Sequence, residues 1–203
     1  MTDNISKGGV RYDDGRLVCN ICYENAIQEA VSADSIMSSL QDVMAEYGIA
    51  TDHVDVPLYL VNRNTMSELA AGFHADPLGF AHYEKTSYAG GLITDKSYKI
   101  YMMIGIPRYE FISALTHELM HVWLFNNAPP EIDPDLREGS CNYAAYLILQ
   151  DYSNPEAKFV IENMLNDPDP VYGDGFRRIK KMVERNGISY WLNYIKNLKI
   201  SSR

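Results

Sequence analysis

The sequence predicts an α+β protein with a small mixed sheet in its N-terminal half and a helical C-terminal half. Short β-like runs occur in the first half, whereas helix starts and stops follow one another in the second. The 203 residues, 46% hydrophobic and 22% charged, are typical of a globular chain with one sizeable core. We expect a polar lead-in over 1–18 and a single domain over 19–203, with an α/β lobe over 19–104 and a helical lobe over 105–203.

The first predicted elements follow from periodicity. Apolar residues between 23 and 47 recur mostly at three- and four-residue steps before Gly48, which predicts one long amphipathic helix. Residues 54–61 (VDVPLYLV) alternate before a proline, as is typical of a strand near a sheet edge. Residues 64–71 predict a short helix.

The middle of the chain predicts a loop over 73–85 and then two β-like runs separated by the polar sequence TDKS, as in a hairpin. After Gly105 the pattern becomes helical, because Pro107 suits a first helical turn and Pro/Gly/Asn/Asp clusters separate the apolar runs. The predicted strands are 88–93 and 98–104, and the predicted helices are 108–125, 134–151, 155–166, 176–186 and 188–198.

Composition excludes several functions. With 27 acidic and 18 basic residues the net charge is −9, and without a Lys/Arg-rich run we expect no nucleic-acid partner and no anionic membrane surface. The N-terminus lacks the apolar core of a signal peptide, and no stretch reaches the ~18 apolar residues of a membrane span. Three cysteines are too few for a disulfide framework. We therefore expect a cytoplasmic protein.

The sequence His117-Glu118-Leu119-Met120-His121 is the central chemical motif. On a helix, His117 and His121 stack on one face, where both imidazoles can reach one metal ion. Glu118 is displaced toward a water on that metal, as a general base requires. The alternative is two histidines on a helix with a purely structural role.

A catalytic zinc ion needs a third protein ligand and an open position. Leu124 and Asn127 exclude the extended HExxHxxGxxH form, which has glycine and histidine there. Glu138 follows His121 by 17 residues, and two antiparallel helices would bring it back over the histidines. This His₂Glu set predicts a zincin-like, gluzincin-type domain. The alternative for Glu138 is a helix-dipole contact in a first turn.

Two further residues are candidates for the site. Asn142, one turn after Glu138, is placed to accept a hydrogen bond from a free imidazole N–H, although a backbone carbonyl is an alternative acceptor. Tyr172, in the run PVYGDGF, could donate its hydroxyl to a developing oxyanion. The alternative for this run is a tight turn with Asp174 as the helix cap.

The runs IGIPRYEFISALTHELMHVWL and LREGSCNYAA resemble the peptidase domain of the LIM-domain-containing, ubiquitin-activated zinc peptidases that restrict organ growth in plants. Three more runs match in order: DGRLVCNICYENAI, VPLYLVNRNTMSE and PVYGDGFRRI. The resemblance covers nearly the whole chain. It implies a zinc-dependent endopeptidase of protein or peptide substrates, with His117, His121 and Glu138 as ligands of one catalytic Zn²⁺ and Glu118 as the base.

The chain also departs from that family. Only 18 residues precede Cys19, and no helix has the pattern of a ubiquitin-interacting motif, so ubiquitin activation and the plant substrates are not carried over. We expect a minimal bacterial relative, with any regulatory protein on another chain. Cys19 and Cys22 form half of a zinc knuckle without nearby partners, which favours free thiols over a second zinc ion or a redox pair.

Two other functions remain open. In the first, the protein is a non-enzymatic interaction module in which zinc joins two helices; Glu118 argues against it, because a structural site needs no base. In the second, it is another class of zinc peptidase, such as those that cleave repressors; the VYGDGF and GIPR runs argue against that class.

Overall fold

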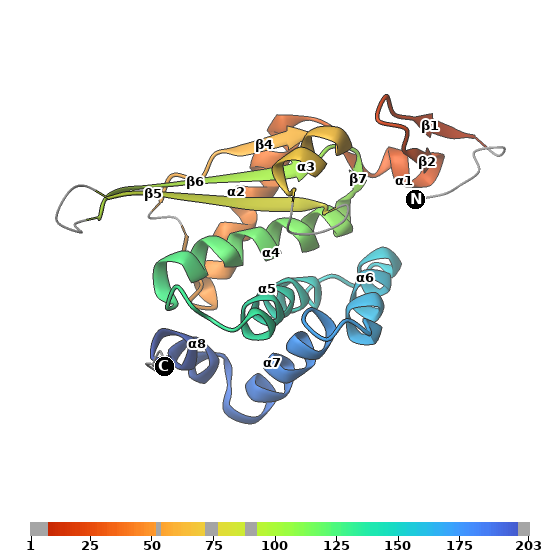
Figure 1. Ribbon diagram of the computed structural model, residues 1–203. Coiled ribbons are helices and arrows are strands. Elements are labelled where there is room, and N and C mark those ends of the chain that lie inside the picture. Colours follow the sequence, from red (N-terminus) through yellow and green to blue (C-terminus); the bar gives the residue numbers. More distant parts are fainter. Residues whose placement is uncertain (1–7, 52–53, 72–76, 88–92, 199–203) are drawn as a thin grey trace.

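A computed structural model gives the structure of the protein and describes residues 8–51, 54–71, 77–87 and 93–198. Figure 1 shows a three-stranded sheet above the long helix α4 (Arg108–Asn127), with the remaining C-terminal helices stacked below α4. The helices below are α5 (Pro134–Leu149), α6 (Pro155–Asn166), α7 (Gly173–Asn186) and α8 (Ile188–Lys196). Small mixed sheets and many helices make this an α+β fold.

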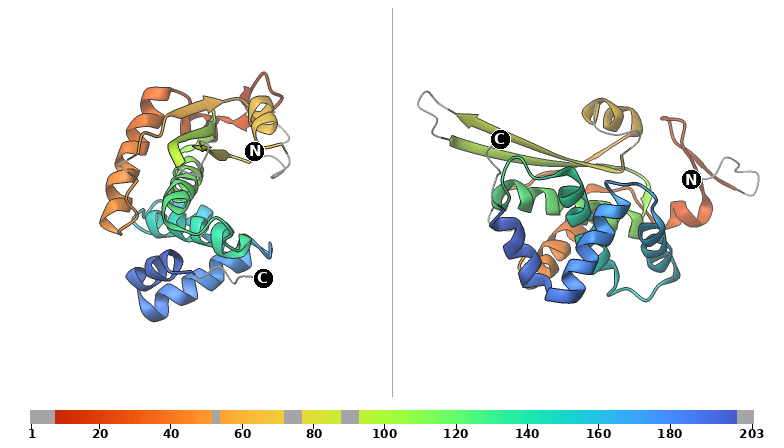
Figure 2. Two further views of the ribbon diagram at one scale, coloured as in Figure 1. Left: turned by 60° about the vertical axis from the view of Figure 1, so that its left-hand side comes forward. Right: turned by 60° about the horizontal axis from the view of Figure 1, so that its bottom comes forward.

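The main sheet has the strand order β4-β6-β5. Its strands are β4 (Leu58–Val61), β5 (Gly79–Ser87) and β6 (Ile93–Met103), and helix α3 (Arg63–Leu69) follows β4. β4 pairs in parallel with β6, in the register Leu58↔Ile100, and β5 pairs with β6 antiparallel, in the register Gly79↔Met102. β5 and β6 continue past β4 as a two-stranded ribbon, which projects beyond the helices in Figure 2. β5 is therefore an edge strand of this sheet.

Helix α4 is enclosed on several sides. It packs against β5 and β6 of the sheet, against α5 and α6, and against α2 (Ala30–Glu46). Leu115, Leu119 and Val122 are fully buried behind the histidine face, and Trp123 is 2% exposed, so these residues belong to the core. No helix among the described residues has the length and apolarity that crossing a membrane requires.

The helical half matches the prediction closely, whereas the first half differs from it. The polar lead-in expected over 1–18 is wrong where the structure describes it, because two paired strands form there, β1 (Gly9–Arg11) and β2 (Leu17–Cys19). Arg16 anchors this pair: its side chain is almost fully buried, forms an ion pair with Asp14 and donates to the backbone oxygen of Ile104. Contacts distant in sequence thus order a segment whose composition alone predicts a loop.

The single helix predicted over 23–47 is wrong. The chain forms α1 (Asn20–Glu24), then β3 (Ala26–Ile27), and α2 begins at Ala30. β3 pairs with β7 (Ile106–Pro107), and this pairing with residues 80 positions away interrupts the helix that local periodicity favours.

The loop predicted over 73–85 is also wrong where the structure describes it, because β5 begins at Gly79. The outer part of this edge strand is polar and exposed, so it lacks the apolar alternation that marks a strand. Most of the strand predicted over 88–93 lies outside the described residues.

Two glycines let α5 and α7 approach each other at backbone distance. A Cβ atom at Gly139 would lie 2.3 Å from the carbonyl carbon of Gly175, and a Cβ at Gly175 would lie 2.3 Å from the backbone oxygen of Asp135. Backbone atoms on both helices leave no room for either methyl group. This close approach brings Tyr172, just before α7, next to His117 of α4 and Asn142 of α5.

Gly139→Ala is therefore expected to destabilise the fold by about 3 kcal/mol, because an inserted methyl group must push two backbones apart. Urea unfolding followed by circular dichroism measures this loss. Gly175→Ala is the matched variant from the facing helix and should give a loss of similar size. A wild-type urea midpoint for either variant would contradict the close packing.

Candidate metal and catalytic site

Helices α4 and α5 bring three predicted ligands together. His117 and His121 lie one turn apart on α4, and their Nε2 atoms are 3.1 Å apart. Glu138 comes from the first half of α5, and its Oε2 lies 3.3 Å from the Nε2 of each histidine. The antiparallel return of α5 over α4, expected from the sequence, thus places one carboxylate oxygen over both imidazoles.

The three atoms fit a zinc ion. In a tetrahedral site with Zn–N and Zn–O distances of about 2.0–2.1 Å, neighbouring ligand atoms lie about 3.3 Å apart. The observed separations of 3.1, 3.3 and 3.3 Å match this spacing. All three side chains are largely buried, so the ligand atoms are held in place by packing.

Cys141 is a further candidate ligand that the sequence analysis did not place here. Its Sγ and the ligand atoms of His117 and His121 lie within 4.8 Å of one another, and the thiol is fully buried. It follows Glu138 by three residues on the same helix, so the helical spacing was a signal that could have found it. Glu138 makes the shorter approach of 3.3 Å to both imidazoles.

Neighbouring polar groups orient the candidate ligands. Arg137 donates from Nε to Oε1 of Glu138 at 2.9 Å, so Oε2 is the oxygen that faces the histidines. The Nδ1 of His117 lies 2.9 Å from Oδ1 of Asn142, and Asn142 in turn donates from Nδ2 to the backbone oxygen of Tyr172 at 3.3 Å. Because an amide oxygen only accepts, the His117 ring donates from Nδ1 to Asn142, which leaves Nε2 as the ring atom that faces the site.

The charges of the site favour an ionised carboxylate. Burial raises the pKa of the Glu138 carboxyl, but hydrogen bonds and charge interactions with His117 and His121 outweigh burial and hold that pKa well below its usual value. Burial lowers the pKa of His117. The hydrogen bond to Glu138 and the charge of Glu118 raise this pKa by more, so the net shift is upward. Glu138 is thus in the form that binds a cation.

Asn142→Ala is expected to weaken zinc binding by roughly 10- to 100-fold, because the His117 ring loses the acceptor that fixes its orientation. Competition with a chromogenic chelator measures this affinity. Asn142→Asp, which keeps an acceptor oxygen in place, is the matched control and should retain more of the affinity. An Asn142→Ala protein that binds zinc as tightly as the wild type would refute an orienting role.

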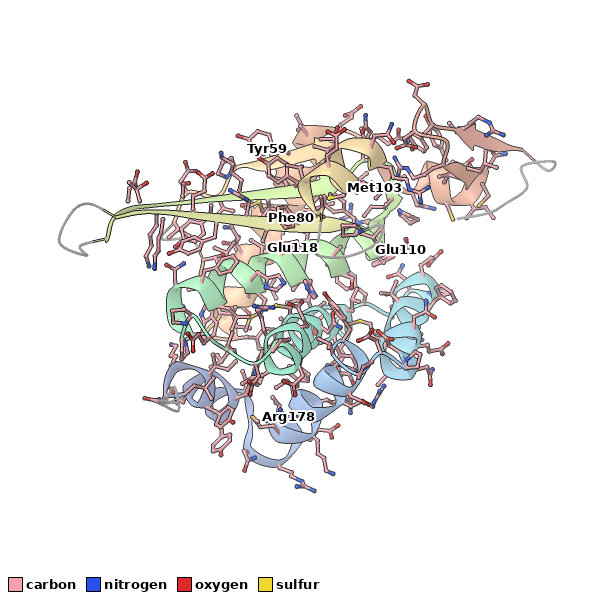
Figure 3. The ribbon with its side chains drawn as sticks, in the orientation of Figure 1. Tyr59, Phe80, Met103, Glu110, Glu118 and Arg178 are labelled. Carbon is pink, nitrogen blue, oxygen red and sulfur yellow. The ribbon has the colours of Figure 1, made fainter. Side chains whose placement is uncertain are left out.

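Glu118 lies on the side of α4 that faces the sheet. Figure 3 shows it beneath Phe80 of β5. The Glu118 residue is 8% exposed, and its Oε2 accepts a hydrogen bond of 2.8 Å from the backbone N–H of Ala81. Glu118 therefore contacts the edge strand through this oxygen. No sequence pattern predicts the role of Ala81, because the contact joins a helix to a strand 37 residues away.

Tyr172 lies beside the candidate ligands. Its ring stacks on that of His117, with centroids 6.3 Å apart and planes at 21°. Burial, followed by the charges of Glu138 and Glu118, raises the pKa of the Tyr172 hydroxyl, so the phenol stays protonated. Asp174 does not cap α7, because it pairs with Arg177; instead Asp169 accepts from the backbone N–H of Tyr172.

Phe125 flanks the histidine pair from the other side. Its ring lies 6.1 Å from that of His121 and 4.9 Å from that of Tyr83 on β5. The Phe125 side chain is half-buried, so it is less enclosed than that of a core residue. Cys19 and Cys22, at the junction of β2 and α1, are free, half-buried thiols.

Comparisons with known proteins find relatives among plant proteins. No family model matches the chain, and no solved structure is significantly similar to it. The chain is 22% identical to Protein DA1-related 1 and 24% identical to Protein DA1, both of Arabidopsis thaliana, over 91% and 92% of its length. It is 24% identical over 90% of its length to LIM domain-containing protein HDR3 of Oryza sativa subsp. japonica.

The chain covers 44%, 45% and 49% of these three relatives, respectively, which is about half of their length. The shared region includes most of this chain and hence the candidate site. Over about nine tenths of its length, this chain is similar to the DA1 and DA1-related proteins of plants.

Proposed function

We propose that the protein is a zinc-dependent endopeptidase with a zincin-like fold of the gluzincin type, formed by one peptidase domain over residues 19–203. One observation carries the proposal: a carboxylate oxygen of Glu138 lies 3.3 Å from both imidazoles of an HExxH helix. A second carboxylate, Glu118, is buried beside them and is not needed as a ligand. The similarity to plant DA1 proteins supports the same class.

His117, His121 and Glu138 would hold the zinc ion. When bound, the ion would act as a Lewis acid that lowers the pKa of a water ligand and polarises the scissile carbonyl. Arg137 and Asn142 keep Glu138 and His117 in the orientation that binding requires, through the contacts described above.

Glu118 would transfer the proton, and Tyr172 would stabilise the negative charge that develops on the substrate. Glu118 accepts a proton from the attacking water and returns it to the leaving amine, so it acts first as a base and then as an acid. Tyr172, which stays a neutral phenol beside His117, donates a hydrogen bond to the oxyanion that develops on the carbonyl.

The substrate is proposed to be a protein or peptide that lies extended along β5 near Glu118, from Gly79 to Tyr83. It would bond main-chain groups other than the Ala81 N–H, which already donates to Glu118. This stretch belongs to an edge strand, and an extended chain can add to such an edge through main-chain hydrogen bonds. The charge of −9 and the absence of a basic run from the sequence favour a protein or peptide over a nucleic acid or an anionic membrane. A regulatory protein, if there is one, is not identified by these residues.

The second candidate function is a non-enzymatic module stabilised by zinc. Cys141 favours it, because a buried thiol near the His₂Glu set could supply a fourth protein ligand. Structural zinc sites have four protein ligands, whereas catalytic sites keep one position open. The two functions therefore differ in whether Cys141 is needed for zinc binding.

Metal removal tests the enzymatic function. The purified protein is expected to contain about one zinc ion per chain, to cleave an unfolded protein such as casein, and to lose this cleavage when a chelator removes the ion. Adding zinc back should restore it. Mass spectrometry of the fragments gives the cleaved bonds, and metal analysis gives the zinc content. Cleavage that persists in metal-free protein would contradict the proposed chemistry.

A further inference from the structure

The contact between Glu118 and the edge of the sheet is not explained by metal binding. The N–H of Ala81 donates to Oε2 of Glu118 at 2.8 Å, across the boundary between β5 and α4. This hydrogen bond joins the main chain of the sheet to the residue that we propose as the base. Its geometry can be followed along β5, residue by residue.

The pairing of β5 shows that this N–H belongs to the free edge. Ala81 stands opposite Ile100, and the N–H of Ile100 points the other way, to the backbone oxygen of Pro57 on the β4 side. Ala81 and Ile100 are thus a non-hydrogen-bonded pair of the antiparallel ladder. Because orientation alternates along a strand, every second residue of β5 has the same outward N–H. These residues are Gly79, Tyr83 and Lys85.

Gly79 makes room for the carboxylate. A Cβ atom at this position would lie 2.8 Å from Cγ of Glu118, closer than real Cβ contacts allow, and 3.0 Å from its Oε1. It would also lie 2.9 Å from Sδ of Met102 on β6, so the glycine is enclosed from two directions. The side chain of Glu118 therefore packs over a bare Cα atom.

Together the two residues restrict the carboxylate. Ala81 binds one of its oxygens, and Gly79 leaves space for the other. A carboxylate with one anchored oxygen presents the other oxygen in a constant direction. This favours proton transfer, because the proton donor and acceptor must be aligned. The anchor is a backbone group, so no side-chain motif in the sequence reports it.

We propose that the backbone N–H of Ala81 and the missing side chain of Gly79 position Glu118 for proton transfer. Both are positioning residues, because they act through Glu118 and not on the substrate. This inference rests on the proposed peptidase function and adds the edge strand to its machinery. It also places the anchor of the base, the Ala81 N–H, and the proposed substrate edge on the same strand, so that movement of β5 would change both.

Amide hydrogen exchange tests the contact independently of turnover. In the full-length zinc-loaded protein, followed by NMR, the Ala81 amide should exchange at least tenfold more slowly than the outward amides of Tyr83 and Lys85. In Glu118→Ala its protection should be lost, while the amides bonded to β6 keep theirs. Exchange of Ala81 as fast as that of Lys85 in the wild type would overturn the inference.

Kinetics test the positioning role. Ala81→Pro removes the N–H without removing a bond to β6, and proline is tolerated at the outward positions of an edge strand. We expect its kcat to fall roughly 10- to 100-fold with KM within about twofold and zinc content unchanged. Gly79→Ala, which keeps every N–H, should lower kcat in the same way. Lys85→Pro is the matched control for proline in β5 and should retain kcat and the unfolding midpoint.

The outcomes separate this inference from the proposed function. An Ala81→Pro protein that folds, binds zinc and keeps the wild-type kcat would overturn the positioning role while leaving the peptidase function intact. A wild type that shows the protected Ala81 amide but no cleavage would overturn the peptidase function, and with it the role in proton transfer.

Discussion

Glu118→Gln is expected to abolish most of the peptidase activity while leaving zinc binding and folding unchanged. The amide cannot accept the proton of the attacking water, and general bases contribute roughly 10²- to 10⁴-fold to such reactions. The isosteric side chain can still accept the N–H of Ala81 through its amide oxygen, so the packing between α4 and β5 should be retained. Initial rates on a fluorogenic peptide identified from the casein fragments measure the loss.

The size and selectivity of this loss are both informative. Zinc content and the thermal unfolding midpoint are the controls, since neither depends on the charge of Glu118 in this interpretation. A Glu118→Gln protein that cleaves at the wild-type rate would show that Glu118 is not the base. A protein that instead loses its zinc would show that Glu118 is a ligand.

Glu138→Ala should have the largest effect on metal binding. It removes the oxygen that lies 3.3 Å from both imidazoles, and we expect zinc affinity to fall by more than about 100-fold, beyond the effect of losing an orienting group. Activity should fall with it, and excess zinc should restore only part of it. Isothermal titration of the metal-free protein with zinc measures the affinity.

Cys141→Ser is the matched variant on the same helix. In a catalytic site with His117, His121 and Glu138 as ligands, replacing this buried thiol should leave zinc affinity within a few fold of the wild type. If Cys141→Ser loses zinc as strongly as Glu138→Ala, the ion has four protein ligands. The structural-module function would then replace the peptidase function.

The helical half of the fold was predictable because its signals are local. Pro107, Pro134 and Pro155 stand at or just before the first residues of α4, α5 and α6, and each is followed by a periodic run. The candidate metal site was predictable for the same reason. Two histidines four residues apart must lie on one face of a helix, and the short connection to α5 makes the return of Glu138 the simplest arrangement.

The sheet half was harder to predict because its elements depend on distant partners. β3 is two residues long and exists because β7 pairs with it, and the outer part of β5 is polar because it lies on an exposed edge. β1 and β2 are held by a buried arginine that reaches Ile104. None of these contacts leaves a periodic trace in the sequence, since each depends on residues far along the chain.

The sequence by itself determined which helix carries the two imidazoles and which carboxylates are available, because helical spacing is a local property of the chain. The tertiary structure alone decided the positions of Arg137 and Ala81 around them. It also decided that Glu118 faces the sheet. Those positions depend on how closely α5, α7 and β5 approach α4, and such distances follow from packing across the whole fold.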